Sequence, residues 1–316
     1  METKFQILKS SIFAENGMAN RNLKMVKWKI CVFCQSVKSF FPKSLHQSVP
    51  SSRSIYHKHT CKFQNVESFF NNQVGIFDEA VQLEREHRVD LDQIKLKLFL
   101  PLLKGHCIIT PDVVGMPGKS APFRTLDTNK DDFGRWLCEV LDRLDIKKIP
   151  FVVSSYSSAM LLSLAEISPD RIEKAALVVP SGISHGPLIP IIFKMAVPMM
   201  KYYFVQSESS FKDIIGLMSS QNDEQTEEFF DLMMSSYKME MKPPREFKRD
   251  ELKHFRSPVM IFASDDDVFF PAYRVFPKAR KLFAGRLTFC RIPGHHLPSD
   301  KTMSLVCKKI ENFFSE

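Results

Sequence analysis

A serine, an aspartate and a histidine follow one another along the chain, and each comes shortly after an apolar run. The runs and the polar residues behind them are 149–153 with Ser155, 259–263 with Asp267, and 287–292 with His296. A serine hydroxyl is a poor nucleophile at neutral pH, so it needs a base within hydrogen-bonding distance. The base needs a carboxylate that fixes its tautomer and stabilises its charged form. These residue types predict acyl transfer, with Ser155 as nucleophile, His296 as base and Asp267 as the acid.

Neighbouring residues compete for each of these roles, and spacing alone does not choose among them. The competitors are Ser154, Ser157 and Ser158 for the nucleophile, Asp265 and Asp266 for the acid, and His295 for the base. A serine that only caps the start of a helix is a further explanation for the serine cluster.

The three residues can meet only if the runs before them are strands of one sheet. The expected strands are 107–110, 149–153, 175–179, 259–263 and 287–292, and the expected helices are 78–103, 131–144, 157–167, 272–283 and 300–314. This alternation predicts an α/β fold with a mostly parallel sheet and right-handed crossovers. Parallel strands bring the residues at their carboxyl ends to a common edge.

The alternation stops between residues 186 and 250 and then returns. This stretch contains no clear strand and shows helical patterns at 190–204, 208–219 and 224–238. We therefore expect a helical cap at 186–250 and a core formed by 61–185 and 251–316. The cap is rich in Met and Phe, which favours a small to medium apolar substrate, although packing of the cap onto the core explains many of these residues equally well.

The basic balance of the chain comes from its first 60 residues. Residues 1–60 hold ten lysines and arginines and two glutamates, whereas charges cancel over the rest of a chain whose formal net charge is +8. We expect this Ser-rich segment to be a disordered leader or a transit peptide. The balanced charges of the remainder predict no nucleic-acid partner.

The cysteines and the apolar runs bear on the compartment. Seven cysteines without framework spacing favour a reducing, cytoplasmic environment, with a mitochondrial or other organellar location as the alternative if residues 1–60 are a transit peptide.

Cys31, Cys34, His57, His59 and Cys61 have the residue types of a zinc site but not its usual spacing, so no metal or other cofactor is expected. The longest apolar stretch, 187–204, is interrupted by prolines and lysines, and no membrane span is predicted. The sequence does not specify the oligomeric state.

Five short motifs occur in an order and at spacings that resemble the α/β-hydrolase family. They are PDVVGMPGKS at 111–120, SPDRI at 168–172, VPSG at 179–182, SDDD at 264–267 and GHHLP at 294–298. The resemblance covers residues 96–316. It implies a Ser-His-Asp hydrolase with a helical cap and, counting back from SPDRI, it places the nucleophile on Ser155. It also implies that the backbone N–H of Tyr156 is an oxyanion donor.

The chain departs from the family pattern in two places. The nucleophile motif of the family, Gly-x-Ser-x-Gly, becomes Val153-Ser154-Ser155-Tyr156-Ser157. The first strands of the family's sheet and the Gly-rich loop that carries the second oxyanion donor have no clear counterpart, so the N-terminal part of the sheet looks incomplete. The resemblance therefore leaves two functions open: an esterase-like serine hydrolase, or a weakly active or inactive hydrolase-like binding protein.

Overall fold

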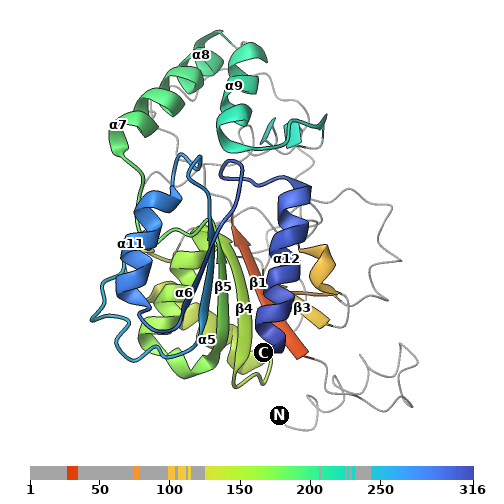
Figure 1. Cartoon of the computed structure of the whole chain (residues 1–316), viewed down its shortest axis with the longest axis vertical. Helices are drawn as coiled ribbons and strands as arrows, with labels where there is room; N and C mark the ends of the chain where they lie inside the picture. Colours follow the sequence, from red (N-terminus) through yellow and green to blue (C-terminus); the bar gives the residue numbers. More distant parts are fainter. Residues whose placement is uncertain are drawn as a thin grey trace, which may run out of the picture.

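The structure is a computed structural model, and a seven-stranded sheet forms its centre (Figure 1). It describes residues 27–34, 74–77, 99–103, 106–111, 113–114, 125–205, 208–224, 226–227, 230–231 and 243–316. The strands are β1 (Lys27–Cys34), β2 (Val74–Phe77), β3 (His106–Pro111), β4 (Ile149–Ser155), β5 (Ile172–Val178), β6 (Val259–Ala263) and β7 (Leu287–Arg291). Their order is β2-β3-β1-β4-β5-β6-β7, and only β2 runs antiparallel to its neighbour. The predicted mostly parallel α/β sheet is confirmed.

Strand β1 lies where the sequence predicts a leader outside the fold. It pairs with β3 on one side and with β4 on the other, so residues 27–34 occupy the middle of the sheet. The expectation of a disordered leader over all of 1–60, and of a sheet lacking its first strands, is corrected for this segment. The strand is hard to recognise in the sequence because its apolar run, Ile30 to Cys34, is short and basic residues surround it.

Helices cover both sides of the sheet (Figure 1). They are η2 (Leu100–Leu103), α5 (Asp132–Arg143), α6 (Tyr156–Ile167), η3 (Pro169–Arg171), α11 (Ala272–Leu282) and α12 (Asp300–Ser315). The expected helix at 78–103 has no counterpart beyond η2 in the described residues, since 74–77 form β2 and 78–98 lie outside them.

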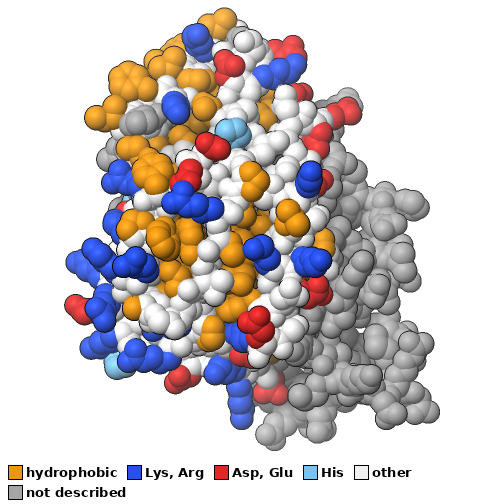
Figure 2. Space-filling model, viewed as in Figure 1, with side chains coloured by type: hydrophobic (Ala, Val, Ile, Leu, Met, Phe, Trp, Pro, Cys, Tyr) orange, Lys and Arg blue, Asp and Glu red, His pale blue; other side chains and the backbone are white. Residues whose placement is uncertain are grey.

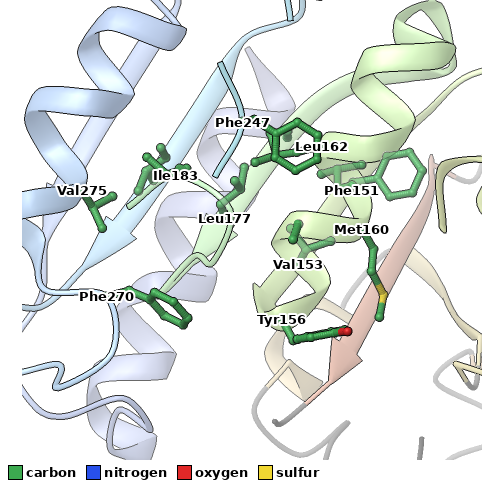
Figure 3. Packing of buried hydrophobic residues seen from close by; sticks show 14 of the residues in the cluster. Phe151, Val153, Tyr156, Met160, Leu162, Leu177, Ile183, Phe247, Phe270 and Val275 are labelled. Atoms are coloured by element: carbon green, nitrogen blue, oxygen red, sulfur yellow. The ribbon is translucent and has the colours of Figure 1, made fainter. Parts of the chain in front are cut away.

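Alternate residues of the central strands enter two different hydrophobic clusters. Phe151 and Val153 of β4 face the cluster that includes α5, α6 and α11, whereas Val152 faces the cluster that includes α12. Figure 3 shows the first of these layers, with Leu177 of β5 and Met160 of α6 among its side chains. All seven residues of β4 are buried. A strand buried on both faces reads as a continuous apolar run, which is why β4 is easy to recognise in the sequence.

The segment between β5 and β6 contains helices that gather at one end of the molecule (Figure 1). They are α7 (Leu188–Ile191), the π-helical turn η4 (Ile192–Ala196), α8 (Val197–Val205) and α9 (Glu208–Met218). The first three follow one another without a break. Pro198 lacks the N–H that would bond to the carbonyl of Lys194 in a regular α-helix, which accounts for the π-helical turn before it. The described residues include no helix both long and apolar enough to cross a bilayer.

Helices α5 and α6 approach each other at Gly134. The backbone N–H of Gly134 donates to Ser163 Oγ at 3.1 Å. A methyl group added at Gly134 would lie 2.6 Å from the carbonyl oxygen of Ser163, a contact that backbone on both helices would have to move to relieve. This close approach fixes the position of α6, the helix that follows Ser155.

We predict that Gly134→Ala lowers the free energy of unfolding by about 1–3 kcal/mol, because overpacking forces the two helices apart. The matched control is Gly216→Ala in α9, where an added methyl group meets no atom within 4 Å. That variant should be more stable than wild type by about 0.5–1 kcal/mol, since alanine favours helix. Urea unfolding of both variants tests the pair, and equal effects at the two sites would contradict the packing argument.

Candidate active site

Ser155 lies at a sharp turn between a strand and a helix. It is the last residue of β4, and α6 begins at the next residue, so the chain changes direction at a single position. Its backbone has φ 53° and ψ −123°, a conformation that residues other than glycine rarely adopt. Such strain persists only where surrounding contacts hold it, and it is the backbone geometry that a nucleophile elbow requires. We call this turn the elbow.

Ser181 holds this turn from the loop that follows the neighbouring strand β5. Its hydroxyl donates to the carbonyl oxygen of Ser155 at 2.9 Å, and its backbone N–H donates to the same oxygen at 3.2 Å. Ser181 belongs to the motif at 179–182, where Val179 and Gly182 both have positive φ. The sequence shows this motif only as the end of a strand. No pattern in the neighbouring residues indicates that Ser181 contacts the turn at Ser155.

The side chains of Ser155, His296 and Asp267 form a continuous chain of hydrogen bonds. Ser155 Oγ lies 2.8 Å from His296 Nε2, and His296 Nδ1 lies 3.0 Å from Asp267 Oδ2. If Nδ1 carries the proton toward the carboxylate, Nε2 is left as the acceptor for the serine hydroxyl. All three residues are at most 3% exposed, so little water competes for these bonds.

The loop that follows β6 fixes the carboxylate of Asp267. Its Oδ1 accepts hydrogen bonds from the backbone N–H groups of Phe269 and Phe270, at 2.8 and 3.1 Å. The other oxygen, Oδ2, is thereby aimed at the imidazole. The rings of both phenylalanines also contact His296, with centroids 5.0 and 5.6 Å from the imidazole. These rings restrict the imidazole to the orientation in which it meets Ser155.

The loop that carries His296 is bound to the end of helix α9. Leu297 N–H donates to the carbonyl of Met218 at 2.7 Å, and Ser220 N–H donates to the carbonyl of Leu297 at 2.8 Å. The hydroxyl of Ser220 accepts from His295 N–H at 2.7 Å. A side chain at Gly294, whose φ is 101°, would overlap Ser220 Oγ. The segment expected as a cap therefore supports the histidine directly.

The competing residues make other contacts. Asp265 forms an ion pair with Arg291, and His295 Nδ1 lies 3.4 Å from the carbonyl of Asp266. Ser157 and Ser158 are fully buried in α6, and in the described residues their hydroxyls have no hydrogen-bond partner. The structure thus brings Ser155, Asp267 and His296 together among the described residues, and it does not bring their neighbours into the same network.

The expected oxyanion donor, Tyr156, is the first residue of α6. Backbone N–H groups in the first turn of a helix point toward its end, where the helix dipole favours negative charge. The tyrosine ring itself packs edge-on against Phe133, with centroids 6.3 Å apart, so the side chain turns into the core (Figure 3). Beside the elbow, Cys34 of β1 stands opposite Ser155 in the sheet register, and residues 35–73, which follow it, lie outside the described residues.

The metal-ligand types found in the sequence do not form a cluster in the part of the chain that the structure describes. No group of three His, Cys, Asp or Glu side chains there could hold an ion. Cys31 and Cys34 lie on β1, while His57, His59 and Cys61 fall outside the described residues.

Neither a family model nor a curated protein matches the chain, but solved structures do. The naproxen esterase of Bacillus subtilis matches with 13% identity over 92% of this chain and 84% of its own, at a TM-score of 0.59. The enol-lactonase of Burkholderia xenovorans LB400 matches with 13% identity over 94% of each chain, at 0.58. A serine hydrolase of Cycloclasticus zankles matches with 13% identity over 90% of this chain and 86% of its own, at 0.53. The chain has the α/β-hydrolase fold.

We predict that Ser155→Gly is more stable than Ser155→Ala by about 1 kcal/mol, because glycine adopts a positive φ without steric cost. At Ser154, which is not among the positive-φ residues, the order should reverse. Thermal unfolding of the four variants provides the measurement. If the glycine variant were less stable than the alanine variant at both positions, the backbone at Ser155 would not be strained.

A small ionic cluster lies beside Phe270. The imidazole of His185 lies 6.2 Å from this ring, measured between centroids. The backbone N–H and the Nδ1 atom of His185 both contact the carboxylate of Glu246, which also forms an ion pair with Lys278. Burial alone raises the pKa of Glu246, but the hydrogen bond from Lys278 and the contacts from His185 outweigh it and lower the pKa below its usual value of 4.5. The charged form is therefore favoured in the folded protein.

We predict that Glu246→Gln lowers the free energy of unfolding at pH 7 by about 0.5–1 kcal/mol, a value reduced by solvent screening at this partly exposed site. Since the pKa is lowered on folding, the contribution of the carboxylate is complete above pH 4.5 and is lost as the pH falls through the folded-state value. Denaturation from pH 7 to 3 should show the variant approaching wild type. A difference that stays constant with pH would argue against the electrostatic origin.

Proposed function

We propose that the protein is a serine hydrolase that cleaves ester-like bonds. The observation that carries this proposal is the hydrogen-bonded chain from Ser155 through His296 to Asp267, buried at the edge of the sheet where β4, β6 and β7 end. Metal-independent acyl transfer needs a nucleophile, a base and a group that orients the base, and these contacts match the three roles.

In the proposed mechanism, Ser155 Oγ attacks the carbonyl carbon of the substrate while His296 Nε2 takes the hydroxyl proton. The carbonyl oxygen becomes an oxyanion, which the N–H of Tyr156 stabilises. Collapse of this intermediate breaks the ester bond, and His296 returns the proton to the leaving alcohol. A water molecule then attacks the acyl-serine with His296 again as base, which releases the acid and restores Ser155. Asp267 stabilises the imidazolium in both halves of the cycle.

A small to medium apolar substrate belongs to the same proposal. It is supported by the apolar surroundings of the imidazole, which contacts the rings of Phe269 and Phe270. Structurally similar proteins include a naproxen esterase and an enol-lactonase, and both names denote hydrolysis of a carboxylic ester or lactone. A cytoplasmic location is also proposed, supported by Cys138, Cys290 and Cys307, none of which forms a disulfide.

Labelling with a fluorescent fluorophosphonate tests the proposal, because this probe reacts only with an activated serine. Wild type should label, Ser155→Ala should not, and Ser154→Ala should label at a rate close to that of wild type. Asp267→Asn should slow labelling and ester hydrolysis by about 10⁴-fold, because the imidazole loses the partner that fixes its tautomer.

The variants also separate the hydrolase from a hydrolase-like binding protein. Full labelling of Ser155→Ala would place the nucleophile elsewhere. If well-folded wild type fails to label and hydrolyses no aryl ester, the hydrolase proposal fails and the binding-protein alternative is favoured.

A further inference from the structure

The continuous helical segment 188–205 has two apolar faces instead of one. Its inner face is buried or half-buried and joins the main hydrophobic cluster through Ile191, Met195, Met199 and Tyr202. The outer face repeats at the same three- and four-residue spacing. It consists of Ile189, Phe193, Val197, Met200 and Phe204 at that spacing, with Val205 beside them at the end of α8, and all six are between 41% and 71% exposed. We call these six residues the outer apolar face.

Single exposed apolar residues are ordinary on a protein surface, but a contiguous stripe is not. Among the described residues, the other large apolar side chains with comparable exposure are Tyr273 on α11 and Leu305 on α12. Figure 2 shows hydrophobic side chains gathered at the end of the molecule formed by α7 and α8. Packing within the chain accounts for the inner face and leaves the outer apolar face without an explanation.

The charges within this helical segment have one sign. Residues 188–205 include Lys194 and Lys201 and no aspartate or glutamate, and both lysines are exposed. The next acidic residue along the chain, Glu208, forms an ion pair with Lys212. The outer apolar face is thus bordered by cations from its own helix.

We propose that the outer apolar face docks on the surface of an anionic membrane, with segment 188–205 lying parallel to the bilayer. Apolar side chains that enter the headgroup region, flanked by lysines that meet anionic lipids, define an interfacial helix. The segment cannot cross the bilayer as a transmembrane helix, because Met195 and Met199 on its inner face pack into the protein core. A second copy of the chain fits less well, since a two-fold contact of this face would bring lysines of like charge together.

Sedimentation with lipid vesicles tests the proposal on the full chain. The vesicles are phosphatidylcholine alone, or phosphatidylcholine with about a third of phosphatidylserine as the anionic component. Wild type should bind the anionic vesicles, and Phe193→Glu/Phe204→Glu should bind at least about tenfold more weakly. The matched control is Tyr273→Glu/Leu305→Glu, which adds the same charge at exposed apolar positions elsewhere and should lose much less. The basic residues at 1–60 are identical in all variants, so their contribution cancels.

Two further variants examine the components separately. Lys194→Gln/Lys201→Gln should lower binding to anionic vesicles and leave weak binding to phosphatidylcholine unchanged. Phe193→Trp places a fluorophore on the outer apolar face, and its emission should shift to shorter wavelength and be quenched by lipids brominated in their acyl chains.

Three outcomes would overturn the proposal. The first is wild type that does not bind anionic vesicles; the second is equal binding by Phe193→Glu/Phe204→Glu and its matched control. The third is concentration-dependent dimerisation in analytical ultracentrifugation that Phe193→Glu/Phe204→Glu abolishes while vesicle binding persists, because the face would then be an interface between copies of the chain. None of these readouts depends on hydrolysis, so the result stands apart from the proposed catalytic function.

Discussion

The structure depends on one backbone constraint: strand β4 runs into helix α6 with no loop between them. The chain must reverse direction at Ser155, and it does so at a positive φ that a serine adopts only under restraint. The restraint comes from both sides. Ser181, in the loop after β5, donates a hydrogen bond to the carbonyl oxygen of Ser155, and Gly134 allows α5 to pack close to α6. The restrained turn places the hydroxyl of Ser155 at the edge of the sheet, within hydrogen-bonding distance of the imidazole of His296.

The imidazole is placed by two loops that belong to different parts of the chain. One follows β6 and fixes Asp267 through two backbone N–H groups. The other carries His296 and is bonded to the end of α9, so the helical segment between β5 and β6 helps to position His296. If that segment also rests on a membrane, as we propose, the docking face on 188–205 and the end of α9 that supports His296 belong to the same helical segment.

The sequence predicts the strands and helices from 131 to 183 and from 259 to 314 well, because buried runs and amphipathic helices leave clear patterns there. It also predicts which of the neighbouring serines, aspartates and histidines meet, but only through the motif spacing, since periodicity alone leaves Ser154 and His295 as competitors. It misses β1, whose basic surroundings resemble a leader. It misses Ser181 and Ser220 because hydrogen bonds between loops distant in sequence have no local signature.

The hydrogen-bonded chain through His296 can be observed directly by proton NMR. An imidazole Nδ1–H held by a buried carboxylate resonates far downfield of the amide region. We predict one such resonance in wild type, lost in Asp267→Asn and shifted in Ser155→Ala, where Nε2 no longer has its hydroxyl partner. A well-folded wild type without this resonance, or one whose resonance is unchanged in both variants, would contradict the account.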